Sequence, residues 1–194
     1  MPDVWEAMGR DHDDESVVIV PSIDLSRASD SVPPSGTLLQ AYEERALVLL
    51  LRLRQPRLRM VYVTSLPVPD QVVEYYLGLL PGVITSHVRA RLTLLSLGDA
   101  GPRPLSAKLL ARPRMLRQIR EKIPTPKRCH LIPYNTTDLE RDVAISLGIP
   151  VYGSDPRLSD LGSKSGCRRV FEAVGVSCPV GAADLFSVDD LVEA

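Results

Sequence analysis

Short apolar runs alternate with longer helical patterns along most of this chain. The runs are typical of buried strands, and they lie at residues 17–21, 60–65, 91–99, 129–135 and 151–156. Strands that alternate with helices form parallel sheets with right-handed crossovers. Nearly continuous apolar strands fit a sheet that is covered on both faces. The sequence therefore predicts an α/β fold, a Rossmann-like, doubly wound, mainly parallel sheet.

The segments between these runs carry signals for helices and for their ends. Residues 38–54 predict one long helix that is buried on most of its surface. Residues 101–124 predict one or two helices, broken near Pro113. Thr136 or Thr137 caps a later amphipathic helix, which ends at Gly148.

Three regions follow from these patterns. Residues 1–15 are polar and acidic and predict a flexible arm. His12 lies among carboxylates in this arm, and a charged tail is a better interpretation of that pattern than a set of metal ligands. Residues 16–155 form the predicted sheet domain. Residues 156–194 form a helical segment after it, with a last helix near the end.

Composition narrows the classes of function. The 194 residues are 44% hydrophobic and 24% charged, with a net charge of -1, which leaves no overall basic surface for nucleic acid or an anionic membrane. Basic residues do gather in LRLRQPRLR and KLLARPRMLRQIREK, where solvated helix faces are the simpler interpretation. Three cysteines without a CxxC pair indicate reduced thiols and a soluble, cytoplasmic protein, with neither disulfides nor structural zinc. The longest apolar run, from Ala46, is too short to span a bilayer.

Polar residues follow the predicted strands, where parallel sheets bind ligands. The candidates for substrate binding are Ser22, Asp24, Thr64, Ser65, Tyr134, Asn135 and Gly153. The same residue types also form turns and caps, so both interpretations stay open. The sequence holds no GxGxxG, P-loop, HExxH or GxSxG motif, and no catalytic residue or metal ligand is assigned. His130 falls inside a predicted strand, where a hydrogen-bonded structural histidine is expected.

The stretch GSKSGCRRVFEAVGVSCPVG, residues 162–181, carries a further candidate. Ser163 caps a predicted helix from Lys164 to Ala173, and Gly175 ends it. A lysine in the first turn opposes the helix dipole at a cost of roughly 0.3–1 kcal/mol. A bound phosphate would make a lysine at this position favourable, because the lysine and the free N–H groups would both contact the phosphate. An exposed lysine without function is the alternative.

Residues 149–181 resemble the segment that enters the ATP-grasp domain of ATP-dependent ligases. Ile149-Pro150, Gly153-Ser154, Lys164 and Gly175-Val176 with Pro179 occupy the positions of that motif in order. Residues 16–190 as a whole resemble the N-terminal part of the pheganomycin-type peptide ligase family. The resemblance implies that the sheet is a pre-ATP-grasp domain and that Lys164 contacts ATP phosphates. Ser163 stands where the family has aspartate, which puts that aspartate's role in doubt.

The resemblance also implies what such a ligase needs in addition. In the family a glycine-rich loop, a second lysine and magnesium-binding acidic residues follow the position of Ala194. We therefore expect ATP and magnesium in the complete enzyme, no tight binding of either to this chain, and no ligase activity from it alone. The expected partners are a C-terminal ATP-grasp domain, in cis or in trans, and a small carboxylate or peptide substrate; a homodimer stays open.

Two other functions compete with the ligase. The first is a stand-alone, non-catalytic Rossmann-like module that binds a ligand or a partner, marked by an exposed apolar surface on residues 157–194. The second is an independent enzyme such as a nucleotide-sugar transferase. It would need an acidic metal pair, whereas Asp155 and Asp160 are typical of a turn and a helix start.

Overall fold

The computed structural model describes residues 14–24 and 35–193. The predicted flexible arm, apart from Asp14 and Glu15, lies outside the described residues, as does His12. Within the described residues, no helix combines the length and the apolar character needed to cross a membrane.

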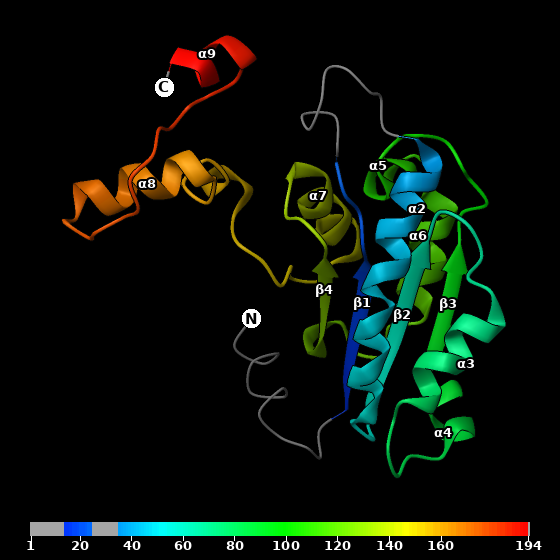
Figure 1. The fold of residues 1–194 in the computed structure, drawn as a ribbon. Coiled ribbons are helices and arrows are strands. Elements are labelled where there is room, and N and C mark those ends of the chain that lie inside the picture. Colours follow the sequence, from blue (N-terminus) through cyan, green and yellow to red (C-terminus); the bar gives the residue numbers. More distant parts are fainter. Residues whose placement is uncertain (1–13, 25–34, 194) are drawn as a thin grey trace. The chain divides into compact units, whose positions relative to one another are not determined.

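Four parallel strands form one sheet in the order β3-β2-β1-β4 (Figure 1). The strands are β1 (Glu15–Val20), β2 (Leu58–Thr64), β3 (Leu92–Ser96) and β4 (Cys129–Pro133). β1 lies at the centre, and its Ile19 pairs with Tyr62 on one side and Ile132 on the other. This is the predicted doubly wound α/β fold, and the prediction is confirmed.

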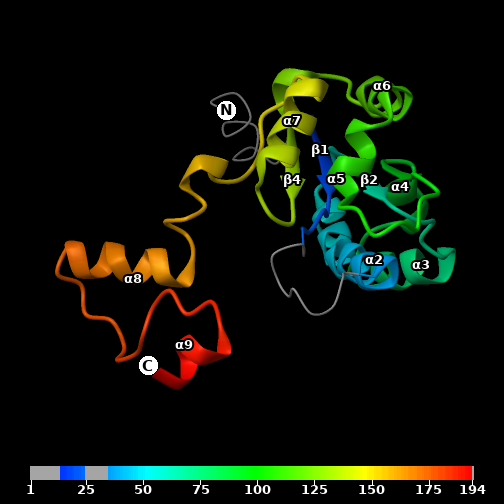
Figure 2. The ribbon, with the colours of Figure 1, turned by 90° about the horizontal axis from the view of Figure 1, so that it is seen from above.

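Helices cover both faces of the sheet (Figure 2). One face is covered by α2 (Gly36–Arg45), the 3₁₀ helix η1 (Ala46–Arg54), α3 (Asp70–Gly78) and α4 (Thr85–Arg89). The other is covered by α5 (Leu105–Leu110), α6 (Pro113–Glu121) and α7 (Asp138–Leu147). Alternate residues of β1 point to opposite faces, so Val17 and Ile19 join one core and Val18 and Val20 the other.

The predicted single helix at 38–54 is wrong in its second half. α2 ends at Arg45, and the next nine residues form η1. Leu47, Leu50 and Leu53 are all fully buried, and they recur at every third position. A 3₁₀ helix has three residues per turn, so this spacing aligns the leucines in one row against the sheet. An α-helix would rotate the row away from it.

The predicted fifth strand at 151–156 is reduced to a single bridge. Val151 pairs with Leu131 in parallel, through the N–H of Leu131 to the Pro150 carbonyl and the N–H of Tyr152 to the Leu131 carbonyl. Proline lacks an N–H for a ladder, and Pro156 instead begins the 3₁₀ helix η3 (Pro156–Leu158). The chain therefore leaves the sheet after one residue pair.

The predicted helix ends are confirmed where their signals are local. Thr137 caps α7 in a capping box with Glu140, and Gly148 ends it in the left-handed conformation. Pro113 is the first residue of α6, just past the end of α5. The C-terminal region holds η2 (Pro126–Arg128) before β4, and α8 (Lys164–Ala173) and α9 (Val188–Glu193) after the sheet.

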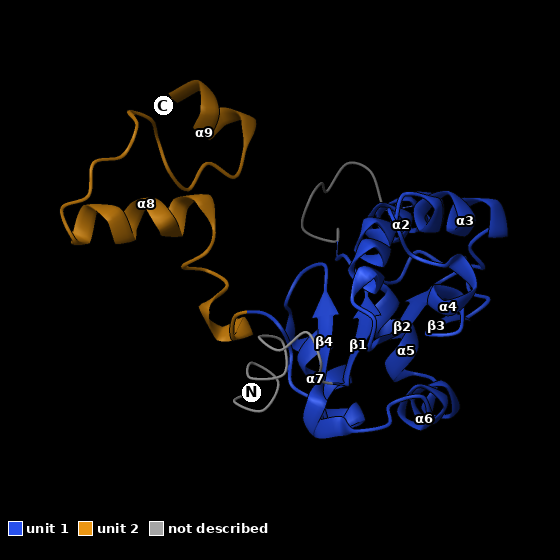
Figure 3. Cartoon of the chain, turned by 90° about the horizontal axis from the view of Figure 1, so that it is seen from below, with its two compact units in different colours: residues 1–153 blue, residues 154–194 orange. Residues whose placement is uncertain are grey.

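The chain divides into two compact units, residues 1–153 and 154–194 (Figure 3). The first holds the sheet and both cores. In the second, Gly166 is the one buried residue among those described. A Cβ at Gly166 would lie 1.9 Å from the Asp160 carbonyl oxygen, so the loop before α8 closes tightly onto its first turn. This second unit is much less well packed than the sheet.

The buried row of leucines on η1 predicts a stability difference between neighbouring positions. We expect Leu50→Ala to lower the free energy of unfolding by about 2–5 kcal/mol, because it opens a cavity in the core. Val48 is 50% exposed on the same helix, and Val48→Ala should change stability by no more than about 0.5 kcal/mol. Urea unfolding followed by circular dichroism measures both. Equal losses would show that the row does not anchor the helix.

Candidate ligand-binding site at the carboxyl edge of the sheet

The strand order reverses between β1 and β4. From β1 the chain passes to α2 on one face, and from β4 it passes to α7 on the opposite face (Figure 2). In open α/β sheets, ligands bind at such a switch point, outside the carboxyl ends of the strands. Here that place lies between the segments that follow Val20 and Pro133.

Several predicted site residues meet at this edge, with different degrees of exposure. Asp24, Tyr134 and Asn135 are exposed. Ser22 is buried, and its hydroxyl oxygen accepts the N–H of Ser106 in α5. The three exposed residues can reach a ligand directly. Ser22 instead connects the end of β1 to α5 through its hydrogen bond.

Gly153 keeps the chain close to the loop that follows β4. A Cβ at this position would lie 2.2 Å from the Thr136 hydroxyl oxygen. Glycine therefore permits the Val151 bridge to pass directly beside the start of α7. Packing against the Thr136 side chain accounts for a glycine here, and its predicted role in substrate binding stays a prediction.

An aromatic pair lies at the same edge. The rings of Tyr42 on α2 and Tyr134 after β4 are 5.7 Å apart at an angle of 69°, an edge-to-face contact. The Arg45 guanidinium lies 5.3 Å from the centre of the Tyr42 ring. Two rings and a guanidinium suit a small ligand that carries a carboxylate, and the exposed Asn135 is the next residue after Tyr134.

Sequence reasoning missed Tyr42 and Arg45. Both belong to α2, whose sequence pattern signals only a helix packed by its leucines. Their relation to Tyr134 exists only in the folded chain, because β4 lies far along the sequence. No local signal marks such a pair.

The end of β2 carries a buried charged network. Glu43 on α2 and Lys108 on α5 are both buried, and the Ser65 hydroxyl connects them. Ser65 donates its hydroxyl proton to Glu43 over 2.6 Å and accepts a hydrogen bond from Lys108 Nζ over 2.8 Å. The Ser65 N–H donates to the second Glu43 oxygen over 2.6 Å, and Lys108 also donates to the Asp99 carbonyl over 3.0 Å.

This network occupies two of the predicted site residues. Ser65 uses its N–H, hydroxyl and carbonyl inside the protein, the last accepting the N–H of Asp99. The Thr64 hydroxyl donates to the Leu66 carbonyl over 2.6 Å. The end of β2 is thus closed by internal hydrogen bonds, while Tyr134 and Asn135, which follow β4, are exposed among the described residues. A direct contact of Thr64 or Ser65 with substrate stays a prediction.

Burial dominates the electrostatics of this network. It raises the pKa of Glu43, against the opposing effect of the Ser65 hydrogen bonds and of Lys108. Burial also lowers the pKa of Lys108, and the negative charges of Glu43 and Asp99 oppose this lowering. The pKa of Asp99 is lowered by the Gly101 N–H and by Arg112, whose guanidinium lies 2.7 Å away.

A signal for Glu43 and Lys108 is present in the sequence. Glu43 lies between Leu39 and Leu47 at helical spacing, on the buried side of α2. Lys108 lies between Leu105 and Leu109 on the buried side of α5. A charged residue inside an apolar stripe indicates a buried pair, although the sequence does not show which charges meet.

His130 does not have the hydrogen-bond partners that the sequence analysis expected. It is fully buried, and neither ring nitrogen forms a hydrogen bond within the described part of the chain. The nearest carboxylate oxygen, of Glu15, lies 3.6 Å from Nδ1. Burial, and to a lesser degree Arg52, lowers the pKa of His130 to about 4. The histidine is therefore neutral at pH 7, as a packing residue in β4.

Two further sites were considered in the sequence. Among residues 14–24 and 35–193, no three His, Cys, Asp or Glu side chains are grouped so that they could hold a metal. Lys164 lies in the second unit, exposed, at the start of α8. Ser163 caps this helix as predicted, accepting the N–H of Gly166 over 2.9 Å, and Gly175 follows its end with φ of 72°.

Two known proteins are similar to this chain. IQ motif-containing protein H of Danio rerio is 28% identical over 197 residues, covering 92% of this chain and 18% of its own length. L-propargylglycine–L-glutamate ligase of Streptantibioticus cattleyicolor is 27% identical over 156 residues, covering 78% of this chain and 32% of its own length. The chain thus spans about a fifth and a third of these relatives. No family model matches it, and no solved structure does. The chain is a distant relative of a ligase.

The buried network predicts a characteristic pattern of stabilities. We expect Lys108→Met to cost about 3–5 kcal/mol of unfolding free energy, because it leaves the Glu43 carboxylate buried without its cation. Adding Glu43→Gln should recover part of that loss, since no buried charge then remains. Lys127→Met, at an exposed position, is the control. Losses in the double variant that equal the sum of the single losses, measured by urea unfolding, would contradict the coupling.

The lowered pKa of His130 predicts a dependence of stability on pH. The unfolded histidine binds a proton below about pH 6.5, while the folded one does so only near pH 4, so stability falls between these values. Relative to His130→Phe, the wild type should lose about 2 kcal/mol of unfolding free energy between about pH 7.5 and about pH 5. Burial raises the pKa of Glu15, which acts in the opposite direction, but Glu15 is present in both proteins. A constant difference between them would refute the prediction.

Proposed function

We propose that this chain is the N-terminal substrate-pocket and scaffold portion of an ATP-dependent, ADP-forming carboxylate–amine or peptide ligase. The observation that carries the proposal is the 27% identity to L-propargylglycine–L-glutamate ligase over 78% of this chain. The doubly wound sheet supports it, because its switch point offers a place for substrate. The reaction joins a carboxylate and an amine at the expense of ATP, which becomes ADP and phosphate.

The carboxylate or peptide substrate binds, in this proposal, at the switch point between β1 and β4. Arg45 supplies a positive charge, Asn135 an amide, and Tyr42 and Tyr134 an aromatic wall. The Glu43–Ser65–Lys108 network supports this edge from inside by holding α2, from which Arg45 and Tyr42 extend. Residues 16–155 are then the pre-ATP-grasp domain.

Lys164 provides the first contact to ATP phosphates in this proposal. Its amine is exposed and makes no ion pair or hydrogen bond to the residues described. It begins a ten-residue helix, whose N-terminal N–H groups and positive dipole end also favour an anion. ATP brings magnesium, which these residues do not hold, so the ligands of the ion belong to the ATP-grasp domain.

Residues 156–194 are the start of that ATP-grasp domain in this proposal, and the rest acts in cis or in trans. The support is the apolar surface of the second unit, where most large apolar side chains are exposed: Leu158, Leu161, Phe171, Val174, Val176, Val180, Phe186, Val188, Leu191 and Val192. Such a surface is typical of an interface, and it is equally the mark expected of the non-catalytic module. Alone, the chain has no ligase activity. The three free cysteines favour a cytoplasmic location.

A non-catalytic module is the second candidate function. The similarity to IQ motif-containing protein H favours it, because that match covers 92% of this chain and the name of that protein describes no reaction. In this alternative the same edge of the sheet binds a ligand or a partner without catalysis.

The coding sequence downstream of the Ala194 codon tests the proposal first. We expect the frame to continue over about a further domain's length, with a glycine-rich loop, a lysine and acidic residues. An immediate stop codon, with no partner gene that supplies these residues, favours the non-catalytic module.

The activity of the complete gene product tests the role of Lys164. We expect it to release ADP from MgATP when amino acids are offered, whereas residues 1–194 alone should release none. Lys164→Ala should reduce ADP release at least about tenfold, by loss of a charged phosphate contact. The exposed Lys127 is the matched control, and Lys127→Ala should have no effect. ADP release by the 194-residue chain would refute the proposal.

A further inference from the structure

The strand β3 forms one edge of the sheet, and its outer side is unpaired among the described residues (Figure 1). It lies last in the order β3-β2-β1-β4 and pairs only with β2. The opposite edge differs, because Val151 bridges there to Leu131 of β4. A free strand edge presents a row of N–H and C=O groups to which another strand can add.

The hydrogen bonds to β2 show which backbone groups of β3 point outward. The Arg91 carbonyl accepts the N–H of Met60 over 2.9 Å. At the other end, the N–H of Leu97 donates to the Thr64 carbonyl over 3.0 Å. Backbone groups alternate between the two sides of a strand, so the odd-numbered residues of β3 face β2. The even-numbered residues face outward, and their N–H and C=O groups bond to no residue that the structure describes: Leu92, Leu94 and Ser96.

The sequence of this edge lacks the usual protection. Natural edge strands often carry charged residues or prolines, which discourage pairing with other chains. Residues 92–96 read LTLLS and contain neither. Every residue of β3 is partly exposed, whereas every residue of β1 is buried. The edge is therefore both accessible and free to pair.

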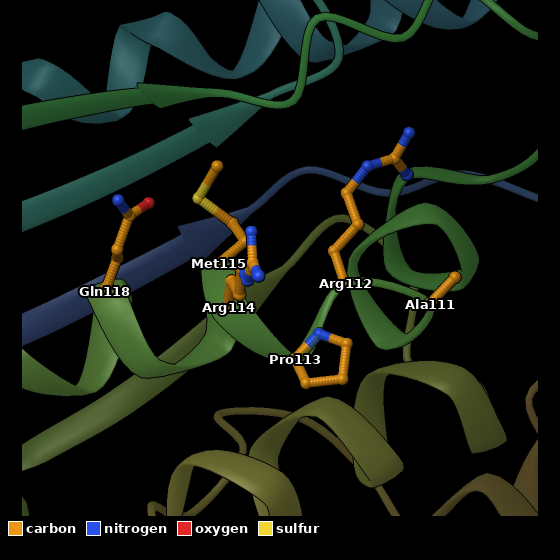
Figure 4. A pocket seen from close by; sticks show the side chains of 6 residues that line it. All are labelled: Ala111, Arg112, Pro113, Arg114, Met115 and Gln118. Carbon is orange, nitrogen blue, oxygen red and sulfur yellow. The ribbon is translucent and has the colours of Figure 1, made fainter.

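One helical layer leaves room beside the core that β3 shares. On the face that α5, α6 and α7 cover, a groove opens at the junction of α5 and α6. Its Met115 extends toward the strands in Figure 4. Met115 and Leu95 of β3 pack against the same core. This layer is thus incomplete, which agrees with the partial exposure of β3.

We propose that β3 pairs antiparallel with β3 of a second copy of this chain, about a two-fold axis at Leu94. Leu94 then lies opposite the partner's Leu94, and Leu92 lies opposite the partner's Ser96. These residues all face outward, so each can donate one hydrogen bond across the axis and accept one. The four-stranded sheet continues through both copies.

The strand favours a second copy as the occupant because it is complementary to itself, as a two-fold interface requires. The outward groups are arranged symmetrically about Leu94, so two copies satisfy all of them. Residues 92–96 are uncharged, so no like charges face each other across the pair. On one face of the sheet Leu94 meets the partner's Leu94, and on the other Leu95 meets the partner's Thr93.

The small contact sets the expected affinity. A pair of five-residue strands buries less than the roughly 800 Å² per partner of a standard stable interface. We therefore expect a weak dimer, with a Kd of about 10–500 μM. Sedimentation velocity of the 194-residue protein from about 5 μM to about 1 mM measures it. The mass should rise from 21.3 kDa toward twice that value.

Amide hydrogen exchange of the wild type locates the contact without a substitution. The amides of Leu92, Leu94 and Ser96 should exchange fast in dilute protein. They should slow about tenfold at a concentration where nine chains in ten are paired, because only the free chain exchanges. The amides of Thr93 and Leu95 face β2 and should be slow at both concentrations.

Two variants at one position separate the outward N–H from the side chain. Leu94→Pro removes the N–H that faces outward, and no bond to β2 is lost. Leu94→Ala removes the same leucine side chain and keeps the N–H. We expect the proline variant to dimerise at least about tenfold more weakly than the alanine variant, with circular dichroism confirming the fold of both. If the proline variant does not fold, the exchange pattern of the wild type decides. Phe186→Ser, at a residue 88% exposed in the second unit, should leave the Kd within about twofold.

Four results would overturn the proposal. A mass of 21.3 kDa at every concentration would show that the chain does not pair. A dimer that Phe186→Ser abolishes and Leu94→Pro leaves intact would place the contact on the second unit. Outward amides that are already slow in dilute protein would show that the edge is covered within the chain. Outward amides that become slow only in a monomeric complete gene product would assign the edge to residues downstream of Ala194.

Discussion

The Ser65 hydroxyl joins the layers of this protein at the carboxyl edge of the sheet. On one side it donates to Glu43 of α2, and on the other it accepts from Lys108 of α5. These helices cover opposite faces, so one side chain at the end of β2 connects both to the sheet. Neither charge is favourable when buried alone. Their joint burial therefore fixes the positions of both helices, and the candidate site depends on that arrangement.

In the proposed function, the candidate site binds the substrate and the second unit contacts ATP. The sheet is packed on both faces and holds its edge residues in place. The second unit has almost no core of its own and exposes its apolar side chains. In the proposed function, the first unit is the scaffold and residues of the ATP-grasp domain cover the second. The support for that proposal is the distant similarity to a ligase.

Much of the fold could be predicted because its signals are local. Thr137, Gly148, Ser163 and Pro113 mark helix ends through their own backbone and side-chain bonds. The 3₁₀ form of residues 46–54 was not predicted, because a crowded row of leucines also suits an α-helix. The predicted fifth strand failed for another reason, since prolines on both sides left one residue pair.

The candidate site was predicted only in part. The ends of β1 and β4 could be found, because parallel strands share their carboxyl edge. The partners from the helices could not, because the contact of Tyr42 with Tyr134 and the bridge between Glu43 and Lys108 join distant parts of the sequence. For His130 the sequence placed the residue correctly in a strand, but the absence of hydrogen bonds to its ring within the described residues follows from tertiary packing.

The 3₁₀ helix η1 has a mechanical consequence for the edge above it. Nine residues rise about 18 Å as a 3₁₀ helix and about 13.5 Å as an α-helix. η1 continues directly from α2, so its stretched form sets how far along the sheet α2 extends. The buried row of Leu47, Leu50 and Leu53 holds η1 in this form and thereby sets that distance. A change that shortened it would move Tyr42, Glu43 and Arg45 together, by nearly the length of one helical turn.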